Sequence, residues 1–194
     1  SDVCSSDLNV GAVTEYRYRG ISQSRFQPAV QAGVDYTDKS GFYVGSWAST
    51  IKWISDSGNG ASGPVELDLY GGYKFPLGGV TMDVGYLRYQ YVNNSLSKAA
   101  TGSYSFKDAN TDELYAAGSY GPFTLKYSYS LSNLFGANYT GQGSKGSGYL
   151  DLSATFDLGD GYSLVPHAGH QTVQNVSIAS RSEEHTSELQ SRET

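Results

Sequence analysis

Charged side chains recur at every second residue in several stretches of this sequence. Near the start, Glu15, Arg17 and Arg19 alternate with Tyr16 and Tyr18. Residues two apart in an extended strand share a face, so the three charges would lie on one side and the two rings on the other. An isolated buried charge is costly, so the charged face must meet water or counter-charges. The alternation therefore predicts a wall between a wet compartment and an apolar one, as in a transmembrane barrel.

The same spacing in later stretches extends the set of charged side chains on the wet face. Acidic and basic groups on opposing walls would create a transverse field that selects solutes by charge and size. Salt-bridged filling of a narrow barrel remains the alternative, since the strand number decides the free bore. The candidate lumen-lining residues are Glu15, Arg17, Arg19, Asp35, Glu66, Asp68, Lys74, Asp83, Glu113, Lys126 and Asp151.

Other chemistry finds little support in the residue spacing. His167 and His170 are three apart, so in a strand they face opposite sides and do not converge on one metal ion. No Gly-x-Ser-x-Gly elbow or comparable nucleophile and base pattern occurs. We therefore expect no catalytic residues, no metal, no cofactor and no enzyme activity.

Strand patterns follow one another along the chain without a competing helical period. The clearest is Phe123, Leu125, Tyr127 and Tyr129 alternating with polar residues, and the stretches around Leu67 and Leu152 are similar. The expected strands cover residues 9–20, 27–37, 41–54, 64–75, 79–91, 112–120, 123–131, 148–158 and 162–173. This pattern predicts an all-β, antiparallel up-and-down barrel with the aliphatic phase facing outward.

The connections between these strands alternate in length. Short turns rich in Gly, Pro and Asp lie at residues 38–40, 76–78, 121–122 and 159–161, and longer polar segments at 22–26, 55–63, 92–111 and 132–147. Outer-membrane barrels have short periplasmic turns and long external loops. Aromatic residues flank the short turns and predict a belt at one membrane interface, although Tyr and Phe are also good strand residues: Tyr36, Phe42, Phe75, Tyr120, Phe123, Phe156 and Tyr162.

Both ends of the chain read as translated sequencing-adapter DNA and are set apart as residues 1–8 and 181–194. The only cysteine, Cys4, belongs to the first of these segments. The whole chain has 13 basic and 19 acidic residues, but without the two end segments 11 basic and 13 acidic residues remain, a net charge of -2. No cluster of Lys and Arg indicates a nucleic-acid partner. The remaining residues form one domain, expected over residues 9–176.

Three motifs in the first quarter of the chain resemble a known family. They are Glu15-Tyr-Arg-Tyr-Arg-Gly-Ile-Ser-Gln23, Pro28-Ala29 and Gly41-Phe-Tyr-Val-Gly-Ser-Trp-Ala-Ser49. The chain resembles the TorF family of bacterial outer-membrane porins from about Asn9 to about Val176. The resemblance implies a barrel of twelve strands, so nine strands would leave it incomplete at the C-terminus, with unpaired edges. It also implies a signal peptide in the full-length gene and an outer-membrane location in a Gram-negative bacterium.

The expected function is passive diffusion of small hydrophilic solutes through the outer membrane. The expected partners are outer-membrane lipid and those solutes, and the oligomeric state is left open. A non-conducting structural or adhesive barrel that presents its loops is the first alternative. A soluble lipocalin-like barrel that binds an apolar ligand is the second, and it predicts an apolar interior instead of a polar one.

Overall fold

A computed structural model describes residues 4–99, 104–139, 141–175 and 184–191 of the chain. One large antiparallel sheet dominates it, with the strand order β1-β4-β5-β6-β7-β9-β10-β13-β15-β14, and β16 pairs with β15. Its strands are β1 (Ser5–Val13), β4 (Ala29–Thr37), β5 (Phe42–Thr50), β6 (Val65–Leu77), β7 (Val80–Val92), β9 (Thr111–Tyr120), β10 (Phe123–Ser130), β13 (Gly148–Ala154), β14 (Phe156–Gly159), β15 (Tyr162–Thr172) and β16 (Glu184–Ser191).

Smaller elements lie in the long connections. They are the strands β2 (Arg17–Tyr18), β3 (Ile21–Ser22), β8 (Tyr104–Phe106), β11 (Ala137–Tyr139) and β12 (Gln142–Gly143), the helix α1 (Trp53–Asp56), and the 3₁₀ helices η1 (Leu96–Ala99) and η2 (Leu134–Gly136). β2 pairs with β3, and β11 pairs with both β8 and β12. Within the ranges that the structure describes, none of the helices has the length and apolar character to span a bilayer.

The all-β antiparallel prediction is confirmed, and each of the nine expected strands has a counterpart in the large sheet. The eighth is interrupted at Thr155, where β13 ends and β14 begins. β1 begins at Ser5 and β16 covers residues 184–191, so the sheet also takes in residues from both end segments set apart above. Among the described residues, the sheet does not close, because no ladder joins β1 to β14, β15 or β16.

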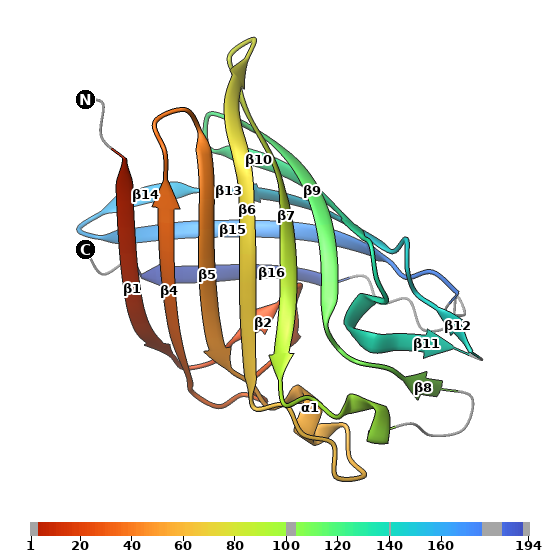
Figure 1. The fold of residues 1–194 in the computed structure, drawn as a ribbon. Coiled ribbons are helices and arrows are strands. Elements are labelled where there is room, and N and C mark those ends of the chain that lie inside the picture. The colour runs from red at the N-terminus through yellow and green to blue at the C-terminus, as the bar shows by residue number, and fades with distance from the viewer. Residues whose placement is uncertain (1–3, 100–103, 140, 176–183, 192–194) are drawn as a thin grey trace.

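The sheet curls strongly (Figure 1). Strands β1, β4, β5, β6 and β7 form one wall, while β13, β15 and β16 run across behind them. The short turns after β4, β6 and β9 lie at one end of the strands, and α1 and the small strands β8, β11 and β12 lie toward the other. The predicted alternation of short turns and long connections is thus present, and it gives the sheet a turn end and a loop end.

The strand prediction for residues 14–20 is wrong. β1 ends at Val13, and the chain then forms the small β2–β3 hairpin, which lies within the curve of the sheet. Arg19 (φ 47°) and Gly20 (φ 79°) have left-handed backbone conformations that make this tight reversal. The Gln23 amide donates to the Tyr16 carbonyl at 2.8 Å and closes the excursion. Tyr16 and Tyr18 therefore lie inside the sheet together with the charges of this stretch.

The two faces of the curled sheet differ in polarity. The aliphatic residues predicted to face outward are exposed or half-buried: Val30, Val34, Leu67, Leu69, Leu125 and Leu152. Their neighbours in the opposite phase turn to the concave side, where Glu66 and Glu113 are each only 2% exposed. The apolar core occupies the loop end of that concave side. It is built from Ile51, Ile54, Ala61, Tyr89, Tyr91, Leu96, Ala99 and Ala109, with Tyr18, Trp53 and Phe135 packed against it.

Candidate functional site

Toward the turn end, the concave face carries a hydrogen-bonded row of tyrosines and ions. The Tyr43 hydroxyl donates to Asp83 Oδ1 at 2.6 Å and also meets the Tyr115 hydroxyl. Lys126 Nζ lies over the Tyr115 ring, 4.1 Å from its centroid. Each side chain comes from a different strand, so the row ties β5, β7, β9 and β10 together across the inside of the curl.

Glycines on the same face make room for these rings. A Cβ atom at Gly45 would lie 2.4 Å from Tyr70 Cε2 and from Asp35 Oδ1, and one at Gly85 would lie 2.4 Å from the Tyr115 oxygen. Real Cβ atoms do not approach other heavy atoms so closely, so only glycine at these positions lets the rings lie against the inner wall. The glycines of these strands therefore allow tyrosine to line the interior.

Other charged groups on the concave face also have partners. Asp35 accepts from the Tyr70 hydroxyl at 2.6 Å. Asp151 Oδ1 lies 3.1 Å from His167 Nδ1. Lys74 is exposed, and its Nζ lies 5.0 Å from the centroid of the Tyr43 ring. Asp68 differs, because its Oδ1 is buried with no hydrogen-bond partner among the described residues.

Arg19 holds the central position between the β2–β3 hairpin and the sheet. Its Nη2 donates to both oxygens of Glu113 at 2.9 and 2.8 Å, and its Nη1 donates to Gln171 Oε1 at 2.8 Å. The guanidinium carbon lies 4.9 Å from the Tyr18 ring centroid and 4.4 Å from that of Tyr149. A planar guanidinium suits both the fork onto a carboxylate and the stacking on rings. Arg19 thus joins β9 and β15 across the concave side.

The protonation states of the hairpin follow from this burial. Burial alone would lower the pKa of Arg19. Its neighbours Tyr18, Tyr89 and Glu113 raise that pKa by more, so it lies above its usual range. Burial raises the pKa of Tyr16 far above its usual range, and Glu66, which accepts from its hydroxyl at 2.6 Å, raises it further. Arg19 is therefore charged, and Tyr16 is a neutral hydrogen-bond donor.

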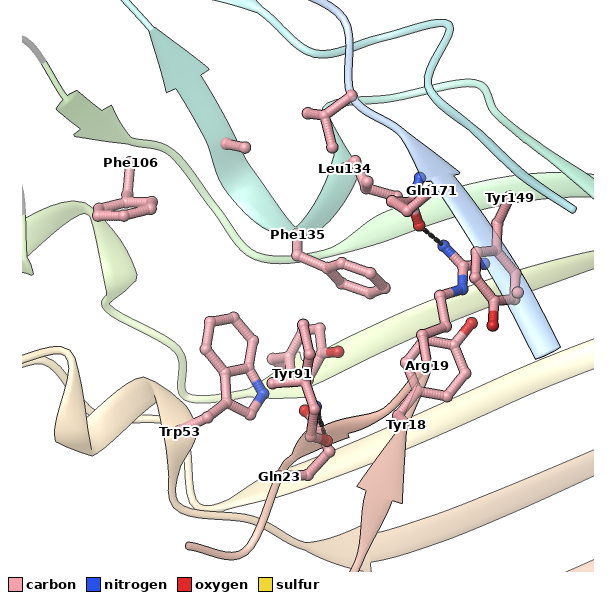
Figure 2. A pocket seen from close by; sticks show the side chains of 14 residues that line it. Tyr18, Arg19, Gln23, Trp53, Tyr91, Phe106, Leu134, Phe135, Tyr149 and Gln171 are labelled. Carbon is pink, nitrogen blue, oxygen red and sulfur yellow. Dashed lines mark hydrogen bonds between the residues drawn. The ribbon is translucent and has the colours of Figure 1, made fainter. Parts of the chain in front are cut away.

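Two cavities adjoin Arg19. The first, termed the aromatic cavity, has a volume of 330 Å³ and lies at the loop end (Figure 2). The second, termed the polar cavity, has a volume of 240 Å³ and is lined by Arg17, Lys126, Ser128, Asp151 and His167. Tyr18, Arg19 and Tyr149 line both cavities. The cavities therefore meet at the Arg19 side chain and its stacked rings.

The structure brings most of the sequence-predicted charged set to one concave face, where several of its members pair with one another. Arg19 pairs with Glu113 from β9, and Arg17 pairs with its chain neighbour Glu15 at 2.9 Å. The predicted belt residues lie at strand ends beside the short turns. Of these, Phe75 is half-buried and stacks on Tyr73, and the rest are exposed: Tyr36, Phe42, Tyr120, Phe123, Phe156 and Tyr162.

Several residues of the interior were missed by sequence reasoning. The inward tyrosines Tyr43, Tyr70 and Tyr115 share the phase of the charged residues, and that phase was the signal that could have identified them. Phe135 and Gln171 carried no such signal, because they reach Arg19 only through the tertiary fold.

The two histidines that were predicted to face opposite sides of a strand do so. His167 faces the polar cavity, whereas His170 is exposed on the opposite face of β15. Within the described ranges, no group of three His, Cys, Asp or Glu side chains has the arrangement to hold a metal ion.

Comparison with known proteins gives a family. A family model described as a bacterial protein of unknown function (Gcw_chp) matches residues 4–186. No curated protein and no solved structure matches the chain.

Proposed function

The chain belongs to the Gcw_chp family of bacterial proteins, and we propose that it is an outer-membrane barrel protein of the porin type. In this proposal the sheet spans the bilayer with its aliphatic face toward lipid, and small hydrophilic solutes diffuse passively through its interior. Resemblance to the TorF porins agrees with this assignment. No cofactor and no chemical step take part.

One observation carries the proposal: polarity is inverted relative to a water-soluble sheet. Val30, Leu125 and Leu152 are 59%, 51% and 49% exposed, while the inward positions of the same strands are mostly polar or charged and include Asp35, Lys126 and Asp151. An apolar outer face with a polar interior is the arrangement of transmembrane barrels. A lipocalin-like barrel would place the aliphatic phase inside. In a membrane-spanning barrel, the exposed rings at the turn end would lie at headgroup level.

The two cavities supply the proposed solute path. A solute would pass from the loop end through the aromatic cavity, past Arg19, and into the polar cavity between Arg17 and Asp151. Arg19 lies at the junction of this path because its side chain lines both cavities. Beyond this point the 34% exposed side chain of Arg17 lines the polar cavity, and a fixed positive charge there raises the barrier for cations and lowers it for anions.

The non-conducting structural barrel is the second candidate, and a specific observation favours it. Arg19 is held by Glu113 and Gln171 and stacked on rings, and its side chain is only 7% exposed. A side chain fixed so firmly between two cavities can also act as a permanent closure. The two candidates share one fold and differ only in whether solute passes Arg19.

Single-channel recording of the full-length protein in planar bilayers tests the proposal. We expect discrete conductance steps, and Arg17→Gln with Arg19→Gln should shift the reversal potential toward cation selectivity. Arg25→Gln is the matched control, since Arg25 is exposed and bound to Asp56 in the loops. Absence of conductance in the unaltered protein would reject the pore and leave the structural barrel.

A further inference from the structure

The aromatic cavity differs in chemistry from the rest of the interior. Its wall carries the rings of Tyr18, Trp53, Tyr91, Phe106, Phe135 and Tyr149. Figure 2 shows these rings converging from the β2–β3 hairpin, α1, the loop-end segments and the strands behind them. Trp53 meets Tyr91 edge to face, with ring centroids 5.4 Å apart. A volume of 330 Å³ lies within the range of small-molecule sites, and a dry cavity of about 150 Å³ already holds benzene.

Most polar atoms of this wall are already used within the protein. Gln23 Nε2 donates to the Ile21 carbonyl at 3.0 Å, and Gln171 Nε2 donates to the Gly148 carbonyl at 2.7 Å. The charge of Arg19 is neutralised by Glu113. The cavity therefore offers no net charge to an occupant, and apolar contact with the rings is its main attraction.

Two donors of the wall have no acceptor. Trp53 Nε1 and Arg19 Nε are buried without a hydrogen-bond partner among the described residues. A buried donor left unpaired costs about 1–3 kcal/mol, so an acceptor oxygen brought beside either one is favoured. Both belong to side chains that line the aromatic cavity.

We propose that the aromatic cavity is a binding site for a neutral, planar, ring-containing small molecule that carries one acceptor oxygen. The rings supply the apolar contact, and Trp53 Nε1 or Arg19 Nε donates to the oxygen. Anionic ligands are disfavoured because Arg19 has its counter-charge in Glu113. This site does not require conduction, since a non-conducting barrel would bind the same ligand.

Tryptophan fluorescence gives a direct test, because the chain has two tryptophans and Trp47 does not line the cavity. In a Trp47→Phe background, Trp53 is the only reporter. The full-length protein in detergent is titrated with 1-indanone, which has fused rings and a ketone, with indane, which lacks the oxygen, and with cyclopentanone, which lacks the aromatic ring. We expect saturable binding of 1-indanone, a midpoint about fivefold higher for indane, and no saturation with cyclopentanone.

A variant that fills the cavity gives the decisive comparison. Ala137 lines the cavity, so Ala137→Phe should abolish the saturable response to 1-indanone. Ala116→Phe is the matched control, since Ala116 is exposed on the outer face of β9, and it should bind normally. Partitioning of 1-indanone into detergent is the same for both variants, so it does not account for a difference between them.

Contrary results would overturn defined parts of the proposal. Saturable binding that persists in Ala137→Phe would place the ligand elsewhere and reject the site. Equal midpoints for indane and 1-indanone would reject the role of the two donors. If Ala137→Phe does not fold, as judged by circular dichroism, Ala137→Leu replaces it, with a higher midpoint expected. Binding without conductance would reject the pore while leaving this site intact, and conductance without binding would do the reverse.

Discussion

The two ends of the concave face are built on the same strands but have different interiors. At the turn end, inward positions carry tyrosines and ions joined by hydrogen bonds, as between Tyr43 and Asp83. At the loop end, the same strands carry Tyr89 and Tyr91, which are 3% and 2% exposed, and Ile54 and Leu96 from the connections pack over them. The strands contribute Leu87, Tyr89 and Tyr91 to the apolar core, and the connections that fold inward complete it at the loop end.

This contrast indicates that different interactions stabilise the two ends. The loop end resembles a protein core, and its energetics should follow buried area and packing. The turn end depends on paired polar groups in an interior that includes the polar cavity. Arg19 lies at the boundary and belongs to both. Variants on either side of this boundary test the comparison.

The largest effect is expected at the boundary itself. Glu113→Gln leaves Arg19 charged and buried without its counter-ion, and breaking a buried pair costs about 3–5 kcal/mol. Chemical unfolding in detergent measures the loss. Asp56→Asn is the control, since its partner Arg25 is 67% exposed and the loss should stay below about 1 kcal/mol. Equal losses for the two variants would mean that the Arg19 pair is not buried in solution.

Truncating a side chain in the loop-end core should cause the next largest loss of stability. Ile54 is 0% exposed, so Ile54→Ala removes buried methyl groups and leaves a cavity, at a cost of about 2–5 kcal/mol. Leu77→Ala, at an exposed hairpin position, is the control and should change the free energy of unfolding little. A small loss at Ile54 would show that the loop end is not a packed core.

A smaller effect is expected at the turn end. Tyr43→Phe keeps the ring but removes the hydroxyl that donates to Asp83, and the unpaired carboxylate costs about 1–3 kcal/mol. The same unfolding assay applies, with Tyr120→Phe, an exposed position, as the control. A change as large as that of Ile54→Ala would contradict the distinction between the two ends.

The smallest effect on stability is expected from Arg17→Gln. Arg17 is 34% exposed and pairs with Glu15, so its loss should cost less than about 1 kcal/mol. Its charge lines the polar cavity, so the reversal potential of a conducting protein should still shift toward cations. A stability loss comparable to that of Glu113→Gln, with no shift in reversal potential, would make Arg17 a structural residue instead.

Much of the fold was predictable because a strand's two-residue period is local. The inward phase of Asp83 and Lys126 and the outward phase of Leu125 follow from their immediate neighbours. The hairpin after Val13 was not predictable in this way. Its charges and rings alternate as a wall strand would, yet the left-handed turn at Arg19 and Gly20 takes the segment out of the sheet.

The sequence by itself therefore determined the antiparallel strands, the short and long connections and the polarity of each face, because these depend on residues close together in the chain. Only the tertiary structure decided which side chains meet inside. Arg19 reaches Glu113 and Gln171, which are 94 and 152 residues away. The curl of the sheet and the inward path of its connections set such contacts, and with them the two cavities. The curl and the inward path each depend on many strand pairings together, so no local pattern encodes them.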